Sequence, residues 1–271
     1  MKPHLYLFLF LFLVLFPILI HSSCGTGTAD YQQIVTDNAT YTRELLQSYR
    51  AAESEEQKAA VLRKTRNHIF NLFSDQLFSY WYGTKYDAQG TTDLPRSGGT
   101  SPTNFVATLM QDANFNVDRV ALAQQSPQNM LLTFCDKKYI RQYNNETMDD
   151  FVQHLHEIGT GLYLLALDDT NIGFLTINSC GIRFVHASPT FSGVKNEDAA
   201  LSDVIRDAKK RSVAMLLDSD WTVRKWLAND VFVVGGQPAP ADTPPAPATQ
   251  QPKEQPAKQP EKATKSKRTE L

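Results

Sequence analysis

The stretch from residue 161 to residue 188, GLYLLALDDTNIGFLTINSCGIRFVHAS, decides the fold. It contains three strand-length apolar runs, at Leu162–Leu167, Ile172–Ile177 and Ile182–Ala187. The two interruptions between them read DDT and NSCG, which are sequences rich in turn-forming residues. Short apolar runs joined by such turns are typical of β-hairpins. The stretch therefore predicts an antiparallel β-meander.

The residues before the meander have a helical periodicity instead. Ser54-Glu-Glu-Gln57 is a capping box, and the apolar residues that follow it fit one long amphipathic helix that ends at Gly83. Residues 83–99 are predicted to be a loop. Pro102 suits the first turn of a further helix, because that turn does not need its N–H. Shorter helices are predicted at about Thr40–Tyr49, from Ser126-Pro127 onward, and from a capping box at Thr147 to Gly159.

After the meander the pattern is mixed. Residues 197–210 are predicted to be helical, and Val213–Leu217 is predicted to be a fourth strand. Trp221–Leu227 is predicted to be a short helix, and Val231–Val234 is a candidate for a last strand. Helices that precede a meander indicate an α+β fold, in which a helical N-terminal half packs on an antiparallel sheet, and not alternating βαβ units.

The first residues of the chain predict export. The apolar run Leu5–Ile20 has 16 residues, which as a helix would span ~24 Å and not the ~30 Å of a bilayer core. With its basic start and the small residues behind it, this run predicts a signal peptide over residues 1–23, and an uncleaved membrane anchor is the alternative. Cys24 follows directly and resembles the acylated cysteine of bacterial lipoproteins, which would hold the chain on a membrane. Cleavage as an ordinary signal peptide, for example after Ala29, is the other reading.

The last residues predict a tail outside the fold. Residues 237–271 contain eight of the 14 prolines and no aromatic residue. Such a segment cannot bury enough apolar surface to offset its ordering entropy, so we expect it to be disordered, proline-rich at first and lysine-rich at the end. The chain is thereby divided into a signal peptide, a linker with a short helix at 24–53, one domain at 54–236, and the tail.

Composition excludes several classes of function. The formal net charge is −2, which argues against a protein that works by coating nucleic acid. The chain contains no glycine-rich phosphate loop ahead of a suitable helix. His154 and His156 are two residues apart on a predicted helix, so they point to different faces and would not share a metal ion. We therefore predict neither a metal nor a cofactor.

Four motifs resemble the NlpC family of papain-like cell-wall cysteine peptidases. They are Trp81-Tyr-Gly-Thr-Lys-Tyr86, Asn104-Phe105-Val106, Asn171-Ile-Gly-Phe174 and Phe184-Val-His-Ala-Ser188. The resemblance implies an NlpC-type fold. It also implies a cysteine nucleophile at the start of the helix after the loop, a histidine base on the first residue of the second meander strand, and an orienting polar residue on the third strand.

This chain departs from the family at the two positions that carry the chemistry. Pro102 stands where the family has its nucleophile, and Asn171 stands where it has its base. Only His186, at the orienting position, is retained. The resemblance therefore implies a pseudoenzyme with a remaining pocket, in which His186 faces the start of the Pro102 helix. We expect this pocket to be lined by Trp81, Tyr86, Thr103, Asn104, Asn171 and His186.

Other nucleophiles stay open as alternatives. Ser101 or Thr103 could act with His186, and so could Cys135 or Cys180, although these two cysteines could also form a disulfide in an exported protein. We expect a lipoprotein anchored to a membrane of the bacterial cell envelope that binds peptidoglycan or an envelope protein. The alternatives are an active hydrolase or amidase that acts on peptidoglycan peptides, and a structural envelope protein that acts through its tail.

Overall fold

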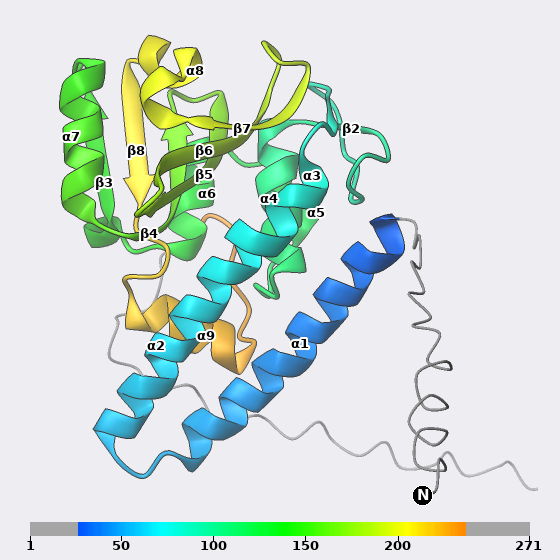
Figure 1. Ribbon diagram of the computed structural model, residues 1–271, viewed down its shortest axis with the longest axis vertical. Helices are drawn as coiled ribbons and strands as arrows, with labels where there is room; N and C mark the ends of the chain where they lie inside the picture. Colours follow the sequence, from blue (N-terminus) through cyan, green and yellow to red (C-terminus); the bar gives the residue numbers. More distant parts are fainter. Residues whose placement is uncertain (1–26, 237–271) are drawn as a thin grey trace, which may run out of the picture.

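The computed structural model describes residues 27–236 (Figure 1). The predicted signal peptide, Cys24 and the predicted tail at 237–271 lie outside these residues. One sheet of eight strands forms the centre, in the order β2-β1-β7-β6-β5-β4-β8-β3. The sheet is antiparallel except for the pairing of β1 with β2. The predicted α+β class is confirmed.

The predicted meander is confirmed. It consists of β4 (Gly161–Leu167), β5 (Asn171–Asn178) and β6 (Gly181–Ser188). Leu164 lies opposite Phe174, and Phe174 lies opposite Val185, so one row of apolar side chains crosses all three strands. Turn chemistry fixes this register, because Asp168 and Gly181 both have positive φ angles in the two hairpins.

The helix predicted for residues 197–210 is wrong in its first part. Strand β7 (Gly193–Asp198) pairs with β6 instead, and only a 3₁₀ turn at Ala199–Leu201 and α8 (Asp203–Asp207) are helical. The fourth strand, predicted at Val213–Leu217, lies three residues earlier as β8 (Lys210–Ala214). The sequence did not predict this start because it includes Arg211, a charged residue that is buried. The guanidinium of Arg211 donates to the carbonyls of Glu146, Ile205 and Arg206, so a charged residue becomes part of the sheet interior.

Three further strands complete the sheet. They are β1 (Lys85–Tyr86) and β2 (Gly99–Thr100), which lie within the predicted loop, and β3 (Ile140–Asn144). Residues 231–234 do not form the candidate last strand. Within the described residues, their one backbone hydrogen bond to a segment distant in sequence runs from Phe232 N to Asn116 O, at 2.7 Å.

The N-terminal helix is much longer than the predicted short helix. Helix α1 covers Gly27–Ala51 and runs beside α2 (Glu55–Asn71), as Figure 1 shows. The prediction failed because the buried side of α1 includes the polar residues Asn38 and Thr42, which hide its apolar periodicity. The capping box at Ser54 is confirmed, since Ser54 Oγ accepts from Gln57 N and the Gln57 side chain accepts from Ser54 N.

The long helix after Ser54 contains one irregular segment. Leu72–Leu77 form a π-helix between α2 and α3 (Phe78–Trp81). In a π-helix, residues five apart share a face. Phe73 and Phe78 therefore both pack on Phe174 of β5, with ring centroids 5.0 and 5.3 Å from it.

Three of the remaining helices begin as the sequence predicts. Ser101, Ser126 and Thr147 cap α4 (Pro102–Asp112), α6 (Pro127–Phe134) and α7 (Met148–Ile158) by accepting a backbone N–H from the first turn. The predicted helix at residues 221–227 is α9 (Asp220–Ala228), and α5 (Arg119–Ala123) was not predicted.

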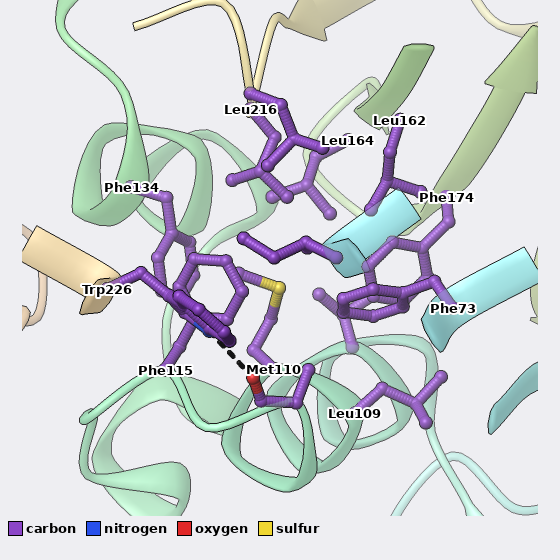
Figure 2. Packing of buried hydrophobic residues seen from close by; sticks show 14 of the residues in the cluster. Phe73, Leu109, Met110, Phe115, Phe134, Leu162, Leu164, Phe174, Leu216 and Trp226 are labelled. Atoms are coloured by element: carbon purple, nitrogen blue, oxygen red, sulfur yellow. Dashed lines mark hydrogen bonds between the residues drawn. The ribbon is translucent and has the colours of Figure 1, made fainter. Parts of the chain in front are cut away.

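Both faces of the sheet are buried. One face packs on α2, α3, α4, α6 and α9 through a large aromatic cluster, in which Figure 2 shows Phe73, Phe174 and Trp226. The other face packs on α7 and α8 through Phe151, Leu155 and Ile205. Within residues 27–236, no helix combines the length and apolar character that crossing a membrane requires.

Candidate functional site

The start of α4 is the position where the resemblance places a nucleophile. Pro102 occupies the first helical position and is buried, and Ser101 is the N-cap. Ser101 Oγ accepts from Asn104 N at 3.2 Å, and it lies 3.4 Å from Thr103 Oγ1. No His nitrogen or carboxylate oxygen in the described part of the chain forms a hydrogen bond with either hydroxyl. Neither hydroxyl therefore has a base beside it to activate it.

Asn104 joins the start of α4 to its surroundings. Its side-chain amide donates to Thr92 O at 2.8 Å and to Thr100 Oγ1 at 3.1 Å, and its Oδ1 accepts from Arg119 Nη1 at 2.9 Å. Asn104 is only 2 % exposed, so all of its polar atoms are used within the protein. This residue positions Arg119 of α5 and the loop before α4, and it is not free to bind a ligand.

A hollow of about 640 Å³ lies beside this network. Its walls come from the loop at residues 88–91, from the first turn of α4, and from α5. Gly90 makes this arrangement possible, because a Cβ at this position would lie 2.3 Å from the carbonyl carbon of Gly99. Arg119 is the one charged residue that lines the hollow; the other polar lining residues are Gln89, Thr91, Ser101, Thr103, Asn104 and Gln124.

Neither Asn171 nor His186 lines this hollow. On β5, Ile172 and Phe174 face the cluster that contains α4, so Asn171 belongs to the opposite face of the sheet. On β6 the same alternation directs Val185 toward α4 and His186 away from it. The structure therefore divides the predicted pocket residues, with Thr103 and Asn104 at the hollow and the other two on the far face.

His186 is completely buried on that far face. Its Nε2 lies 3.0 Å from Glu197 Oε1, and its ring stacks on Phe184 with centroids 4.2 Å apart. Ser202 Oγ also donates to Glu197 Oε1, at 2.6 Å. Burial by itself would raise the pKa of Glu197, but the hydrogen bonds from His186 and Ser202 outweigh it and hold that pKa below its usual value.

Three side-chain polar atoms of β5 and β6 on this face have no hydrogen-bond partner in the described residues. They are His186 Nδ1, Asn171 Oδ1 and Ser188 Oγ. His186 and Ser188 are both fully buried, so the free nitrogen of the imidazole is enclosed away from solvent. The imidazole is held by Glu197 as an orienting carboxylate would hold it, but no hydroxyl or thiol among residues 27–236 hydrogen-bonds to its other nitrogen.

The remaining candidates have structural surroundings. Trp81 is fully buried and donates its indole N–H to Tyr31 Oη at 2.9 Å, and Tyr86 is half-buried in β1. Cys135 and Cys180 are both free, so the alternative of a disulfide between them is wrong. Burial raises the pKa of the Cys135 thiol far above neutral, which makes it a poor nucleophile. Cys180 is exposed in the β5–β6 hairpin, at the far end of the strand from His186.

Sequence reasoning missed Arg119, which is the main charged group of the hollow. A single arginine in a five-residue helix has no periodicity or spacing that would mark it. Its role depends on Asn104, fifteen residues earlier, and only the folded chain brings them together. The described residues contain no group of three or more His, Cys, Asp or Glu side chains arranged to hold a metal ion.

Comparisons with protein-family models, with curated proteins and with solved structures find no match for this chain.

Proposed function

We propose that the domain is a non-catalytic relative of the NlpC cysteine peptidases that binds a ligand of the bacterial cell envelope in the hollow at the start of α4. One observation carries this proposal. The hollow is lined by hydroxyl, amide and guanidinium groups, and none of its lining residues is a Cys, His, Asp, Glu or Lys. Such a lining can hold a polar ligand but cannot supply a nucleophile with its base.

The position of Pro102 supports the absence of peptidase chemistry. A cysteine peptidase places its thiol at a helix start, where the positive end of the helix favours the thiolate. The first residue of α4 is a buried proline, which has neither a nucleophile nor an N–H. Ser101 caps this helix, and the Asn104 side chain fixes the adjacent loop.

Arg119 indicates the chemistry of the ligand. Its Nη1 is committed to Asn104, which fixes the direction of the guanidinium while leaving its other N–H groups to bind. A guanidinium held in this way is suited to a carboxylate, which it can meet with two parallel hydrogen bonds. The peptides of peptidoglycan carry free carboxylates, so they are the class of ligand that we propose. The apolar side chains of Val120 and Ala123 complete the wall.

We also propose that the protein is exported and anchored to a membrane of the cell envelope. The apolar run Leu5–Ile20 followed by Cys24 supports export and acylation. A lipid anchor would hold the domain against the envelope layer that contains its ligand.

Calorimetry with soluble peptidoglycan peptides tests the proposal. We expect the wild-type protein to bind them without hydrolysis, and we expect Arg119→Gln to weaken binding about tenfold or more, since a charge-assisted hydrogen bond contributes about 1.5–3 kcal/mol. Arg141→Gln is the matched control, because Arg141 is an exposed arginine of β3, away from the hollow. Hydrolysis that a thiol reagent abolishes would show an active peptidase. Absence of binding, or equal weakening by both variants, would overturn the proposed site.

A further inference from the structure

A second hollow lies between α1, α4 and the loop that precedes β2. Its volume is about 340 Å³, and its lining includes two carboxylates, Asp93 and Asp112, and no basic side chain. The hollow at the start of α4 has the opposite character, with Arg119 as its charged residue. The two hollows therefore differ in the charge of the ligand group that each would attract.

Two hydrogen bonds in series hold one oxygen of the Asp112 carboxylate in place. Trp81 Nε1 donates to Tyr31 Oη at 2.9 Å, and Tyr31 Oη donates to Asp112 Oδ2. Within residues 27–236, no hydrogen bond reaches the other oxygen of Asp112. Burial raises the pKa of Asp112 to about 6, a rise that the Tyr31 hydrogen bond opposes and the nearby charge of Asp93 adds to. At neutral pH, Asp112 is thus an ionised group with one oxygen left to accept.

Thr108 is an independent sign of a ligand. This residue lines the same hollow, is 1 % exposed, and its Oγ1 has no hydrogen-bond partner in the described residues. Other buried helix threonines donate to the carbonyl four residues earlier, as Thr42 and Thr133 do. Leaving a buried hydroxyl unpaired destabilises the folded protein. A bound donor or acceptor in the hollow would remove that cost.

We propose that this hollow binds a primary alkylammonium group, such as the end of a lysine side chain or a diamine. An ammonium has three N–H donors, and the three lining residues Asp93, Asp112 and Thr108 each have a side-chain oxygen that can accept one. Its positive charge would also relieve the repulsion between the two carboxylates. The side chains of Val35 and Leu94 line the same hollow and would contact the methylene stem of the ligand.

Titration with the full-length protein tests this site, with Nα-acetyl-lysine amide as the probe and its Nε-acetylated, uncharged form as the control ligand. We expect the charged probe to bind in the millimolar range and the uncharged one not to bind. Asp93→Asn and Asp112→Asn should each weaken binding about tenfold or more, because each removes a charge-assisted hydrogen bond. Thr108→Val should weaken it roughly threefold to tenfold. Asp149→Asn is the matched control, since Asp149 is an exposed carboxylate on α7, over the opposite face of the sheet.

The pH dependence gives a second readout. Binding should weaken as the pH falls through about 6, where Asp112 takes up a proton. The other titratable groups facing Asp112 are Tyr31 from α1, whose pKa is raised by burial and which stays neutral, Asp93 from the loop and Arg119 from α5. Asp112→Asn should abolish this dependence.

Several outcomes would overturn the site. They are no binding of the charged probe at millimolar concentration, equal binding of the acetylated probe, or unchanged binding in Asp93→Asn. Asp93 is exposed, so this variant keeps the test decisive even if Asp112→Asn does not fold.

Discussion

Gly173 of β5 lies directly opposite His186 of β6, and the backbone at 173 has no room for a side chain. A Cβ at this position would lie 2.7 Å from the His186 Cβ and 2.6 Å from the carbonyl oxygen of Val185. The stacked rings of Phe184 and His186 therefore depend on a glycine beneath them. The glycine and the histidine form one packing unit.

Gly173→Ala should destabilise the domain because the added methyl group must displace the β6 backbone. We expect a loss of about 1–3 kcal/mol in the free energy of unfolding, the usual cost of overpacking. Urea denaturation measures it. Gly27→Ala is the control, since a Cβ at Gly27 meets nothing within 4 Å. A loss of equal size in both variants would contradict the packing unit.

His68 should make the domain less stable in mild acid. His68 of α2 is half-buried against α1 and α9. This burial, with a smaller effect from the charge of Lys64, lowers the pKa of His68 to about 4. In the unfolded chain His68 takes up a proton near pH 6.5, the ordinary pKa of histidine. The contribution of neutral His68 to the free energy of unfolding is therefore fully present above pH 6.5 and is lost as the pH falls toward 4. Urea denaturation at several pH values should show this loss, and His68→Gln should reduce the slope. An NMR titration that protonates His68 near pH 6.5 would contradict it.

Glu197 should affect the stability of the domain at a lower pH than His68 does. Burial tends to raise its pKa, but hydrogen bonds from His186 and Ser202 hold it below the ordinary value of 4.5. A lowered carboxylate pKa adds stability that is present above pH 4.5 and is lost as the pH falls through the folded-state value. We expect the wild type to lose stability below pH 4.5 more steeply than Glu197→Gln does, measured by thermal unfolding. Parallel profiles would show that Glu197 is not the group responsible.

The two described cysteines should differ in reactivity. Cys180 is exposed and should react with a thiol reagent in the native protein, whereas Cys135 is buried and should react only on unfolding. Comparing Cys180→Ser with Cys135→Ser separates the two, because only the first should lose the rapid native reaction. Rapid labelling of Cys135 in native protein would contradict its burial.

Local signals predicted the elements that local chemistry determines. The capping boxes at Ser54 and Thr147 and the turns of the meander each depend on a few adjacent residues, and the structure confirms them. Strand β7 and the shift of β8 could not be predicted in this way. The charged residues Glu197 and Arg211 find partners for their polar groups only after the chain has folded.

The candidate site was predicted only in part for a similar reason. The runs that contain Asn171 and His186 are apolar on both faces, because both faces of the sheet are covered. Such a run shows that a strand is buried but does not show which of its faces meets α4. The pairing of Asn104 with Arg119 depends on how α4 and α5 pack, and no sequence spacing specifies that.

The π-helix at Leu72–Leu77 suggests how this chain can change in evolution. Each residue of an α-helix turns the following residues by ~100°. Deleting one residue from this segment would return it to α-helical winding and leave Phe78 four residues after Phe73. Residues four apart share a face of an α-helix, so both rings would still face Phe174. Related chains should therefore include some that lack one residue here, so that an alignment gap in this segment would mark an α-helix in place of the π-helix, over the same core.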